Sequence, residues 1–383
     1  MTSFLKSALL LSSFILCHFN SFAQDSNAKE KKGIKYLIEK QLSKPDGIRI
    51  YPLPVGSYSE ETSFLFGASV LAYFKADYKD SLQRPSSIIS QAVYTLNKQA
   101  VFNIYADGWT KGNGSHYIGD LTYLKFPDYF YGIGNDTKQA DKELTITRKF
   151  GAVANWEKEI LPNVYAGPVS SIQFDKFENP SDNGLLNQNN YQGENGGLIW
   201  YLGGSIIFDS RDLSTYPTKG LFSKATISIA NKTIFSDYDL VRLKMEQRAF
   251  IPIKKDLILG GHIAYEGLFG DAPFYQMREL GSSSIMRGYF PGRFRDQNLL
   301  AAQSEIRWRP FYLLGFSAFA GAGNVYSHED FDPTNLKPNF GVGLRIFAEP
   351  SSKTTIRIDY GWGEKPPGEP RISGLTIFIN EAF

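Results

Sequence analysis

Charged and apolar residues alternate along the stretch Tyr238-Asp-Leu-Val-Arg-Leu-Lys-Met-Glu-Gln-Arg-Ala-Phe250. Successive side chains of a β-strand point to opposite faces, so this stretch predicts a strand with one charged face and one apolar face. The charged face carries Arg242, Lys244, Glu246 and Arg248, and the apolar face carries Val241, Leu243 and Met245. In a soluble sandwich the apolar face would lie against a second sheet. Several charges in a row on the other face favour a strand that separates lipid from a hydrated lumen.

The same alternation recurs along most of the chain, for example in residues 303–309. About sixteen such segments, each of roughly ten to fifteen residues, can be placed within 47–383, and an even number is what bacterial barrels require. Short turns such as Tyr216–Gly220 and Ala348–Ser352 separate some of them, whereas the Asn- and Gly-rich residues 178–195 predict a long loop on the opposite, extracellular side. The predicted fold class is therefore all-β, a transmembrane antiparallel β-barrel of about sixteen strands.

The first residues of the chain have the pattern of a secretory signal peptide. Lys6 precedes the apolar run Ala8–Phe19, and the small residues Ser21 and Ala23 stand where a signal peptidase reads the chain. The apolar run is too short to span a bilayer as a helix. Cleavage after Ala23 would remove Cys17 and leave a mature chain without cysteine, so neither a disulfide nor thiol chemistry is expected.

The expected organisation is a signal peptide at 1–23, a periplasmic segment at 24–47 and an outer-membrane barrel at 48–383. The periplasmic segment has apolar residues at helical spacing over 28–43, which predicts a short amphipathic helix weakened by Gly33. This helix could lie at the membrane surface, cap the barrel mouth or thread inside the barrel. A loosely ordered lead-in segment is the alternative, because an isolated helix of this length is marginal in water.

Composition and motif content argue against nucleic acid as a partner and against catalysis. The formal net charge of +2 is too small to indicate a surface that binds a polyanion. His116, His262 and His328 lie far apart in the sequence, and neither a catalytic triad, a Gly-x-Ser-x-Gly elbow nor metal-ligand spacing accompanies them. No catalytic residue, metal ligand or cofactor is therefore expected, and the protein is predicted not to be an enzyme.

The longest irregular stretch between predicted strands contains Gly-Ser-Ser-Ser-Ile-Met-Arg-Gly-Tyr at Gly281–Tyr289. Together with other motifs in the same order, it resembles the BamA, TamA and two-partner-secretion transporter superfamily, in its bacterial surface antigen branch. The motifs are Leu280–Tyr289 as the long-loop motif, Ser304–Arg307 as the following strand motif, Asp209–Asp212 with Pro217–Gly220 as an upstream strand-turn signature, and Tyr131–Asn135 as a segment common in this branch. The resemblance covers nearly the whole chain from about Ile48 onward.

The resemblance implies a barrel whose long loop, between strands 11 and 12, folds back into the lumen. The residues at the tip of this loop are Arg287, Gly288 and Tyr289. The resemblance also implies that Phe383, as the aromatic last residue of the last strand, serves as a signal for barrel assembly. The residues of the upstream signature are Asp209, Arg211 and Asp212. They are interpreted as a lumen or turn network rather than as reactive groups.

One position departs from the family's pattern. In the family, the strand after the one that holds Ser304–Arg307 usually carries Phe-x-Asp-x-Gly, whose aspartate faces the lumen beside the loop arginine. Here that strand has Phe319-Ala-Gly-Ala-Gly323, so glycine stands in place of the acid. A guanidinium between carboxylates forms strong charge-assisted hydrogen bonds, and Glu305 and Asp359 remain as inward acids. We expect Arg287 to contact Glu305, with Asp359 as the substitute partner; the alternative is a solvated Arg287.

By resemblance, the protein assists membrane insertion or transport of proteins or lipids at the bacterial outer membrane, through a weak seam between the first and last strands. Pro52 and Pro54 remove two hydrogen-bond donors from the first strand, and Gly374 weakens the last strand. Both features fit a weakly paired seam between these strands, and both also occur in ordinary edge strands. The family's periplasmic polypeptide-transport-associated domains do not fit between Gln24 and Ile48, so assembly work would need a partner supplied in trans. The expected partners are outer-membrane lipids and an unidentified periplasmic or outer-membrane protein. The alternative function is a passive or gated pore, or a structural barrel.

Overall fold

The computed structural model of the chain describes residues 47–59, 63–80, 82–178, 184–188, 191–328, 330–349 and 354–383. The predicted signal peptide and the helix expected over 28–43 lie outside these ranges. Within them, no helix is both long enough and apolar enough to cross a membrane.

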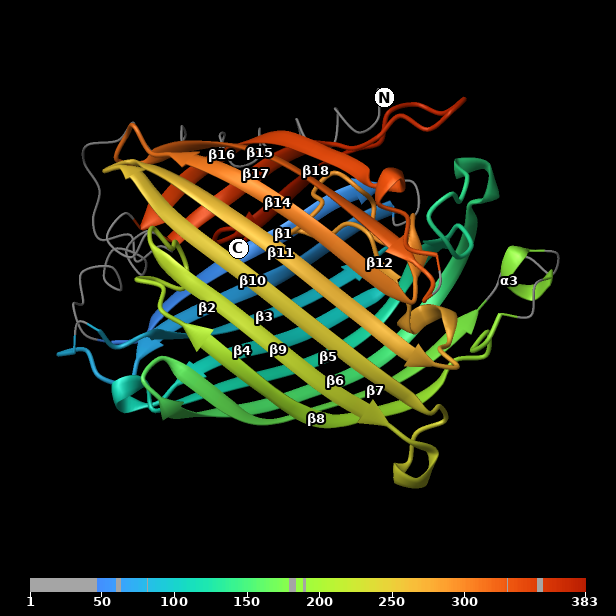
Figure 1. The fold of residues 1–383 in the computed structure, drawn as a ribbon, viewed down its shortest axis with the longest axis horizontal. Coiled ribbons are helices and arrows are strands. Elements are labelled where there is room, and N and C mark those ends of the chain that lie inside the picture. The colour runs from blue at the N-terminus through green and yellow to red at the C-terminus, as the bar shows by residue number, and fades with distance from the viewer. Residues whose placement is uncertain are drawn as a thin grey trace, which may run out of the picture. The chain divides into compact units, whose positions relative to one another are not determined.

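Sixteen strands of the described ranges form one antiparallel sheet, in which each strand is hydrogen-bonded to the next along the chain (Figure 1). This agrees with the number predicted from the alternation of polar and apolar residues. The strands are β1 (Arg49–Ser59), β2 (Ser63–Lys75), β3 (Pro85–Thr95), β4 (Ala100–Trp109), β5 (Ser115–Phe130), β6 (Glu143–Leu161), β7 (Val164–Glu178), β8 (Gly197–Asp209), β9 (Gly220–Ala230), β10 (Leu240–Lys254), β11 (Leu257–Gly270), β14 (Asn298–Trp308), β15 (Leu314–Tyr326), β16 (Lys337–Glu349), β17 (Thr354–Trp362) and β18 (Ser373–Ile379).

The connections contain short elements. The strands β12 (Arg278–Glu279) and β13 (Arg295–Asp296) form a separate two-stranded sheet between β11 and β14. The helices are η1 (Lys111–Asn113), η2 (Gln139–Asp141), α3 (Leu185–Gln188), η3 (Lys232–Ile234), η4 (Phe274–Gln276) and η5 (Pro333–Asn335). Each is a single turn or little more, so the architecture is set by the strands.

The last strand is shorter than the sequence pattern predicts. A strand is expected over 373–383, but β18 has 7 residues and ends at Ile379. Asn380 has a left-handed backbone, with φ of +67°, and its amide donates to the carbonyl oxygen of Thr355. Asparagine tolerates this conformation better than most residues, and it turns the chain out of the extended state. Residues 380–383 therefore leave the sheet.

The chain divides into two compact units. The first extends to Pro127 and includes Thr147–Ala154, and the second consists of Asp128–Ile146 and Asn155–Phe383. In the first unit, β1 to β4 pair in chain order and expose apolar side chains such as Phe64. The second unit contains β7 to β18 and the candidate functional site.

Strands of the second unit have the reverse of the polarity found in soluble proteins. Along β14, the polar residues Gln303, Glu305 and Arg307 are buried, whereas Ile306 and Trp308 are 46% and 52% exposed. Soluble proteins keep charged groups at the surface and bury most large apolar side chains. Apolar side chains outside and charged ones inside are typical of strands that separate lipid from a polar interior.

The connection between β11 and β14, residues 271–297, is here named the latch loop. It folds against the inner face of the sheet. Its buried apolar residues are Leu280, Ile285, Met286, Tyr289 and Phe294, and they form a cluster with Leu299 and Ala301 of β14 and Val325 of β15. Leu299 and Ala301 lie on the same face of β14 as Glu305, because side chains of a strand repeat every second residue. The long loop is therefore inward-folded, as the sequence motif implies.

Candidate functional site

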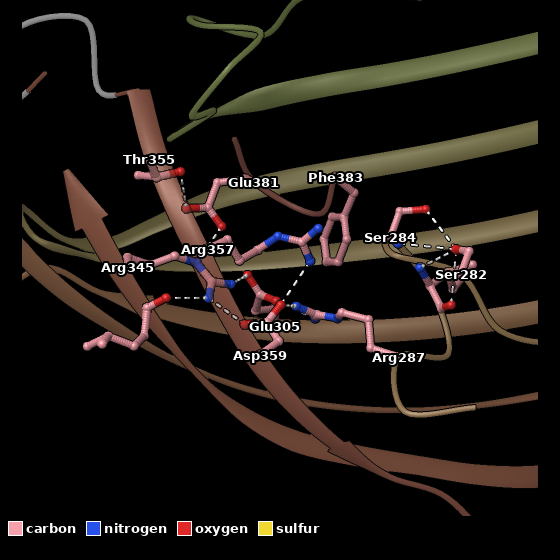
Figure 2. A network of polar contacts seen from close by, with 12 residues as sticks. Ser282, Ser284, Arg287, Glu305, Arg345, Thr355, Arg357, Asp359, Glu381 and Phe383 are labelled. Carbon is pink, nitrogen blue, oxygen red and sulfur yellow. Dashed lines mark hydrogen bonds and ion pairs between the residues drawn. The ribbon is translucent and has the colours of Figure 1, made fainter. Parts of the chain in front are cut away.

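Arg287 lies at the tip of the latch loop and is fully buried, with 0% of its surface exposed. Its Nη2 donates to Glu305 and its Nη1 donates to Asp359 (Figure 2). Its guanidinium carbon also lies 3.6 Å from the centroid of the Phe319 ring. The sequence proposed Glu305 as the partner and Asp359 as the substitute, and the structure brings both to the same arginine. The alternative of a solvated Arg287 is therefore wrong.

Arginines of the strands share the same two carboxylates. Glu305 accepts from Nε of Arg307 at 2.7 Å and from Nη2 of Arg345 at 3.2 Å. Asp359 accepts from Nη1 of Arg345 and, at 2.8 Å, from Nη1 of Arg357. Each carboxylate thus faces guanidinium groups from both the strands and the latch loop. This arrangement offsets the large cost of removing the charges from water.

Glu381, from the segment after β18, adds another carboxylate. Its Oε2 accepts from Nε of Arg345 at 2.8 Å and lies 3.5 Å from Nε of Arg307. We name as the wall cluster the residues Glu305, Arg307, Arg345, Arg357, Asp359 and Glu381. The side chains of this cluster include as many carboxylates as arginines, so their formal charges sum to zero without Arg287.

Phe383 lies beside the wall cluster, and its side chain is buried (Figure 2). Its backbone oxygen accepts from Nη2 of Arg307 at 2.7 Å. The centroid of its ring is 5.1 Å from that of His262 and 6.2 Å from that of Phe250. Phe383 is therefore an interior packing residue in this structure, and its use as an assembly signal stays a prediction.

Backbone geometry holds the tip of the latch loop. Gly288 has a φ of +105°, and a Cβ at this position would lie 2.5 Å from the carbonyl carbon of Gly361 in β17. Glycine alone accommodates both the left-handed backbone and this close approach. The Tyr289 hydroxyl donates to the carbonyl oxygen of Pro338 at 2.7 Å and accepts from the amide of Glu364 at 2.9 Å. Each residue of the Arg-Gly-Tyr tip thus makes its own contact with the sheet or with a loop beside it.

Glycines of β15 and β16 make room for the cluster. A Cβ at Gly343 would lie 2.0 Å from Oδ1 of Asp359, so this glycine makes room for the carboxylate. A Cβ at Gly321 would lie 2.3 Å from the carbonyl oxygen of Ala302. An aspartate therefore does not fit at Gly321 on this backbone, and Asp359 supplies an acid to Arg287 from another strand.

The segment Tyr131–Asn135 belongs to a connection, residues 131–138, that we name the strap. An isolated β-bridge joins Gly134 of the strap to Arg295 of the latch loop, and the Gly134 amide donates to the Arg295 carbonyl oxygen at 2.7 Å. Arg293 of the latch loop pairs with Glu369 at 3.0 Å. These contacts hold the part of the latch loop that follows its tip.

Asp209, Arg211 and Asp212 form a separate turn network after β8, as interpreted from the sequence. Nε and Nη2 of Arg211 donate to the two carboxylate oxygens of Asp209, each at 2.9 Å. Asp212 accepts from the amide of Thr218 at 2.8 Å and so closes the turn. The carboxylates of Asp209 and Asp212 accept hydrogen bonds from donors of the same turn, so this network stabilises the turn.

The same turn reaches the segment after β18. Tyr216 is buried, and its ring centroid is 5.4 Å from that of Phe347. The amide of Glu381 donates to the carbonyl oxygen of Thr215 at 3.4 Å. Burial, and then the negative charge of Glu381, raise the pKa of Tyr216 to about 12. The turn between β8 and β9 therefore covers this side of the wall cluster with a neutral phenol.

The three histidines singled out from the sequence lie in different surroundings. Nε2 of His262 is 2.9 Å from Oε1 of Glu246, and Nε2 of His116 is 3.0 Å from Oδ1 of Asp107. His328 stacks on a phenylalanine ring of β11, with centroids 4.6 Å apart. Among the residues that the structure describes, no group of three or more His, Cys, Asp or Glu is placed to hold a metal ion.

The sequence patterns did not single out Arg345, Arg357 or Glu381. Arg345 and Arg357 are directly opposite each other in β16 and β17. Two like charges at directly opposite positions destabilise a pair of antiparallel strands unless nearby acids compensate them. Two arginines opposite each other therefore indicate that acids lie close to them. That signal appears only once the strand register is known. Glu381 was not identified, because the sequence placed it inside a strand predicted over 373–383. In the structure that strand, β18, ends at Ile379.

Comparisons with known proteins agree with this architecture. A model of the Omp85 superfamily domain matches residues 91–383. No protein of curated function matches the sequence. BamA from Haemophilus ducreyi lacking POTRA domains 1–3 is similar in fold, with a TM-score of 0.54 and 13% identity over 87% of this chain and 69% of that one.

Two further solved structures have the same fold. CdiB from Acinetobacter baumannii has a TM-score of 0.52 and 12% identity, over 86% of this chain and 59% of that one. CdiB from Escherichia coli has a TM-score of 0.53 and 9% identity, over 86% of this chain and 61% of that one. The chain therefore spans less than two thirds of either CdiB chain. At these identities the likeness is one of fold, a BamA-like β-barrel.

Proposed function

The chain belongs to the Omp85 superfamily, and on this premise we propose that it assists the insertion or transport of proteins at the bacterial outer membrane. The role is non-catalytic: the barrel supplies a surface and an interior, and the latch loop changes between a closed and an open arrangement. Outer-membrane lipids surround the barrel, and a periplasmic or outer-membrane protein supplied in trans delivers the client.

The observation that carries the proposal is the charge balance around Arg287. The wall cluster has equal numbers of arginines and carboxylates, and Arg287 adds one more cation to it. When Arg287 leaves, Glu305 keeps Arg307 and Arg345, and Asp359 keeps Arg345 and Arg357. No carboxylate is then left buried and unpaired, which is the costly outcome when a buried ion pair is broken. The sheet can therefore release the loop tip without losing its own cluster.

Contacts of the latch loop other than those of Arg287 stabilise the closed arrangement. The Tyr289 hydroxyl bridges Pro338 and Glu364, and the strap pairs with the latch loop through Gly134 and Arg295. The apolar cluster of the loop also lies against β14 and β15. A closed element with a balanced wall behind it has the properties of a two-state switch. A client or a partner protein that binds the interior would shift it to the open state.

The test is a depletion strain complemented with variants. Depletion is expected to lower the amounts of other outer-membrane barrels, measured by quantitative mass spectrometry of isolated outer membranes. Wild type restores them, and Arg287→Gln restores them only in part because the closed state is weakened. Arg211→Lys is the control, since it changes an arginine of the turn network while keeping the cation that faces the buried Asp209, and it is expected to restore them fully. Unchanged barrel amounts after depletion would reject the proposal.

The second candidate function is a pore, and the polar inner faces of the strands favour it. Charged residues such as Glu305, Arg307 and Asp359 lie buried on the inner faces of the strands, as in barrels with a polar interior. Planar bilayers with purified protein separate the two functions. A pore gives a large and stable conductance in wild type, whereas a closed latch gives little conductance that rises in Arg287→Gln. A large, stable wild-type conductance together with unchanged barrel amounts after depletion would replace the proposal with the pore.

A further inference from the structure

A groove of about 590 Å³ lies where the turn between β10 and β11 meets β14 and β15. Two kinds of side chain line it. Lys254 and Lys255 supply ammonium groups from the turn, and Ile306, Trp308 and Phe316 supply apolar surface from the outward-facing side of the strands. The volume falls in the range of roughly 300–1,000 Å³ that is usual for small-molecule sites.

A β-bulge directs Lys254 to the groove. The register between β10 and β11 shifts between Pro252 and Lys254. Strict alternation would put Lys254 on the inner face together with Phe250, which is 3% exposed. The extra residue of the bulge breaks this alternation, and Lys254 is exposed next to Lys255. Bulges commonly re-aim a side chain in this way.

The charge of the lining is positive. The groove contains two lysines and one acid, Asp256. Within the part of the chain that the structure describes, neither Lys254 nor Lys255 forms an ion pair. The methylene groups of a lysine can pack against an apolar surface while its ammonium group stays in water. The two ammonium groups are therefore free to bind an anion at the edge of the apolar surface.

The apolar part of the groove has the chemistry of a membrane boundary. The rings of Trp308 and Phe316 are 6.2 Å apart and both are exposed. The turn that follows β14 exposes Phe311 and Tyr312 by 60% and 73%. Tryptophan and tyrosine concentrate at the level of lipid headgroups, where one end of the ring is dry and the other is wet. An occupant of this groove therefore meets lipid chains on one side and water on the other.

We propose that the groove binds one anionic glycerophospholipid, with its phosphate between Lys254 and Lys255 and its acyl chains along Ile306, Trp308 and Phe316. A protein is the less suitable occupant, because a stable protein interface buries about 1,200–2,000 Å² and these strand residues face lipid. The inference needs only a barrel in a membrane. It is independent of the insertion role, so each can fail without the other.

The test uses Trp308 as the reporter. The full chain is reconstituted in two sets of phosphatidylcholine nanodiscs. One set contains a small mole fraction of brominated phosphatidylglycerol, and the other contains the same mole fraction of brominated phosphatidylcholine. Brominated acyl chains quench tryptophan fluorescence on contact. The chain has 5 tryptophans, so the Trp308 part of the signal is the difference between wild type and Trp308→Phe. Brominated phosphatidylglycerol is expected to quench this part with a preference of roughly five- to thirtyfold over phosphatidylcholine, the size expected for one or two lysines at an anionic lipid.

Two variants locate the effect. The double variant Lys254→Gln/Lys255→Gln is expected to lose the preference, and the double variant Lys219→Gln/Lys232→Gln, which removes the same charge from other turns, is expected to keep it. Equal quenching of wild-type Trp308 by the two lipids would overturn the proposal without any variant. Preference that survives in Lys254→Gln/Lys255→Gln, or that is lost equally in the control, would also overturn it.

Discussion

Arg211 and Arg287 are both arginines held by carboxylates, but their partners lie at very different distances along the chain. Arg211 binds Asp209, two residues before it, and both of its bonds stay within one turn. Arg287 binds Glu305 and Asp359, which are 18 and 72 residues away and lie on different strands. A local pair stabilises only its own turn. A remote pair ties a loop to the sheet, so its loss changes which arrangement the loop adopts.

The largest effect is expected for Asp359→Asn. This change leaves Arg287 and the arginines of the wall cluster facing only Glu305 and Glu381, so the excess of buried positive charge increases. The free energy of unfolding is expected to fall by about 3–5 kcal/mol, measured by urea unfolding in detergent micelles. Asp212→Asn in the exposed turn is the control and should resemble wild type. A wild-type value for Asp359→Asn would show that Asp359 is not part of a shared cluster.

Arg287→Gln is expected to have the second largest effect, and the effect should be local. The closed loop loses two charge-assisted hydrogen bonds, a cost of about 2–3 kcal/mol, while the wall cluster stays balanced. The barrel should therefore remain folded while trypsin cleaves the latch loop faster at its own arginines. The control is Arg211→Lys, which keeps a cation beside the buried Asp209 and should leave the latch loop protected. If Arg287→Gln unfolded the whole barrel, the balance argument would be wrong.

Gly288→Ala is expected to displace the loop tip at a cost on the order of 1–2 kcal/mol. The left-handed backbone and the contact with Gly361 both contribute, and Gly368→Ala is the control, a change at a positive-φ glycine outside the latch loop. Gly368 also has a positive φ, +76°, but a Cβ there meets nothing within 4 Å. Proteolysis of the latch loop should therefore accelerate in Gly288→Ala and stay unchanged in Gly368→Ala. Equal behaviour of the two variants would mean that the close approach to Gly361 does not hold the tip.

The smallest effect is expected for Arg211→Lys, about 1 kcal/mol in the free energy of unfolding, because the cation that faces the buried Asp209 is kept while the two-point guanidinium contact is lost. Asp209 keeps the hydrogen bond from the backbone amide of residue 211, at 3.1 Å in the native chain. The change should stay inside the turn between β8 and β9, as measured by amide hydrogen exchange of residues 210–220. Faster exchange in the latch loop would show that the turn network and the latch are coupled, and would remove the contrast between the two arginines.

Periodicity predicted the strands well because it reports which side of a strand meets lipid. The charged face of the stretch from Tyr238 to Phe250 became the inner face of β10, and the count of strands agreed with the sheet. The last strand was predicted too long, because alternation continues past Ile379 while a left-handed Asn380 ends the strand. The alternation of polar and apolar residues does not report a single residue with a left-handed backbone, so it could not predict where this strand ends.

The candidate site was predictable only in part. Arg287, Glu305 and Asp359 could be proposed from a loop motif and from the faces of single strands. Arg345 and Glu381 could not, because they join the cluster through strand register and through the turn after β18. Arg345 contacts Glu305, Asp359 and Glu381 at once, and no two of these acids belong to one local segment.

The sequence by itself determined the class of fold, the inner and outer faces of the strands and the arginine at the tip of the long loop. These follow from local rules: alternation along a strand, and glycine where the backbone must turn. The tertiary structure decided how the charges are shared. Strand pairing, the latch loop and the segment after β18 together bring four arginines and three acids into one buried cluster, and the balance of side-chain charge that lets Arg287 depart is visible only in that cluster.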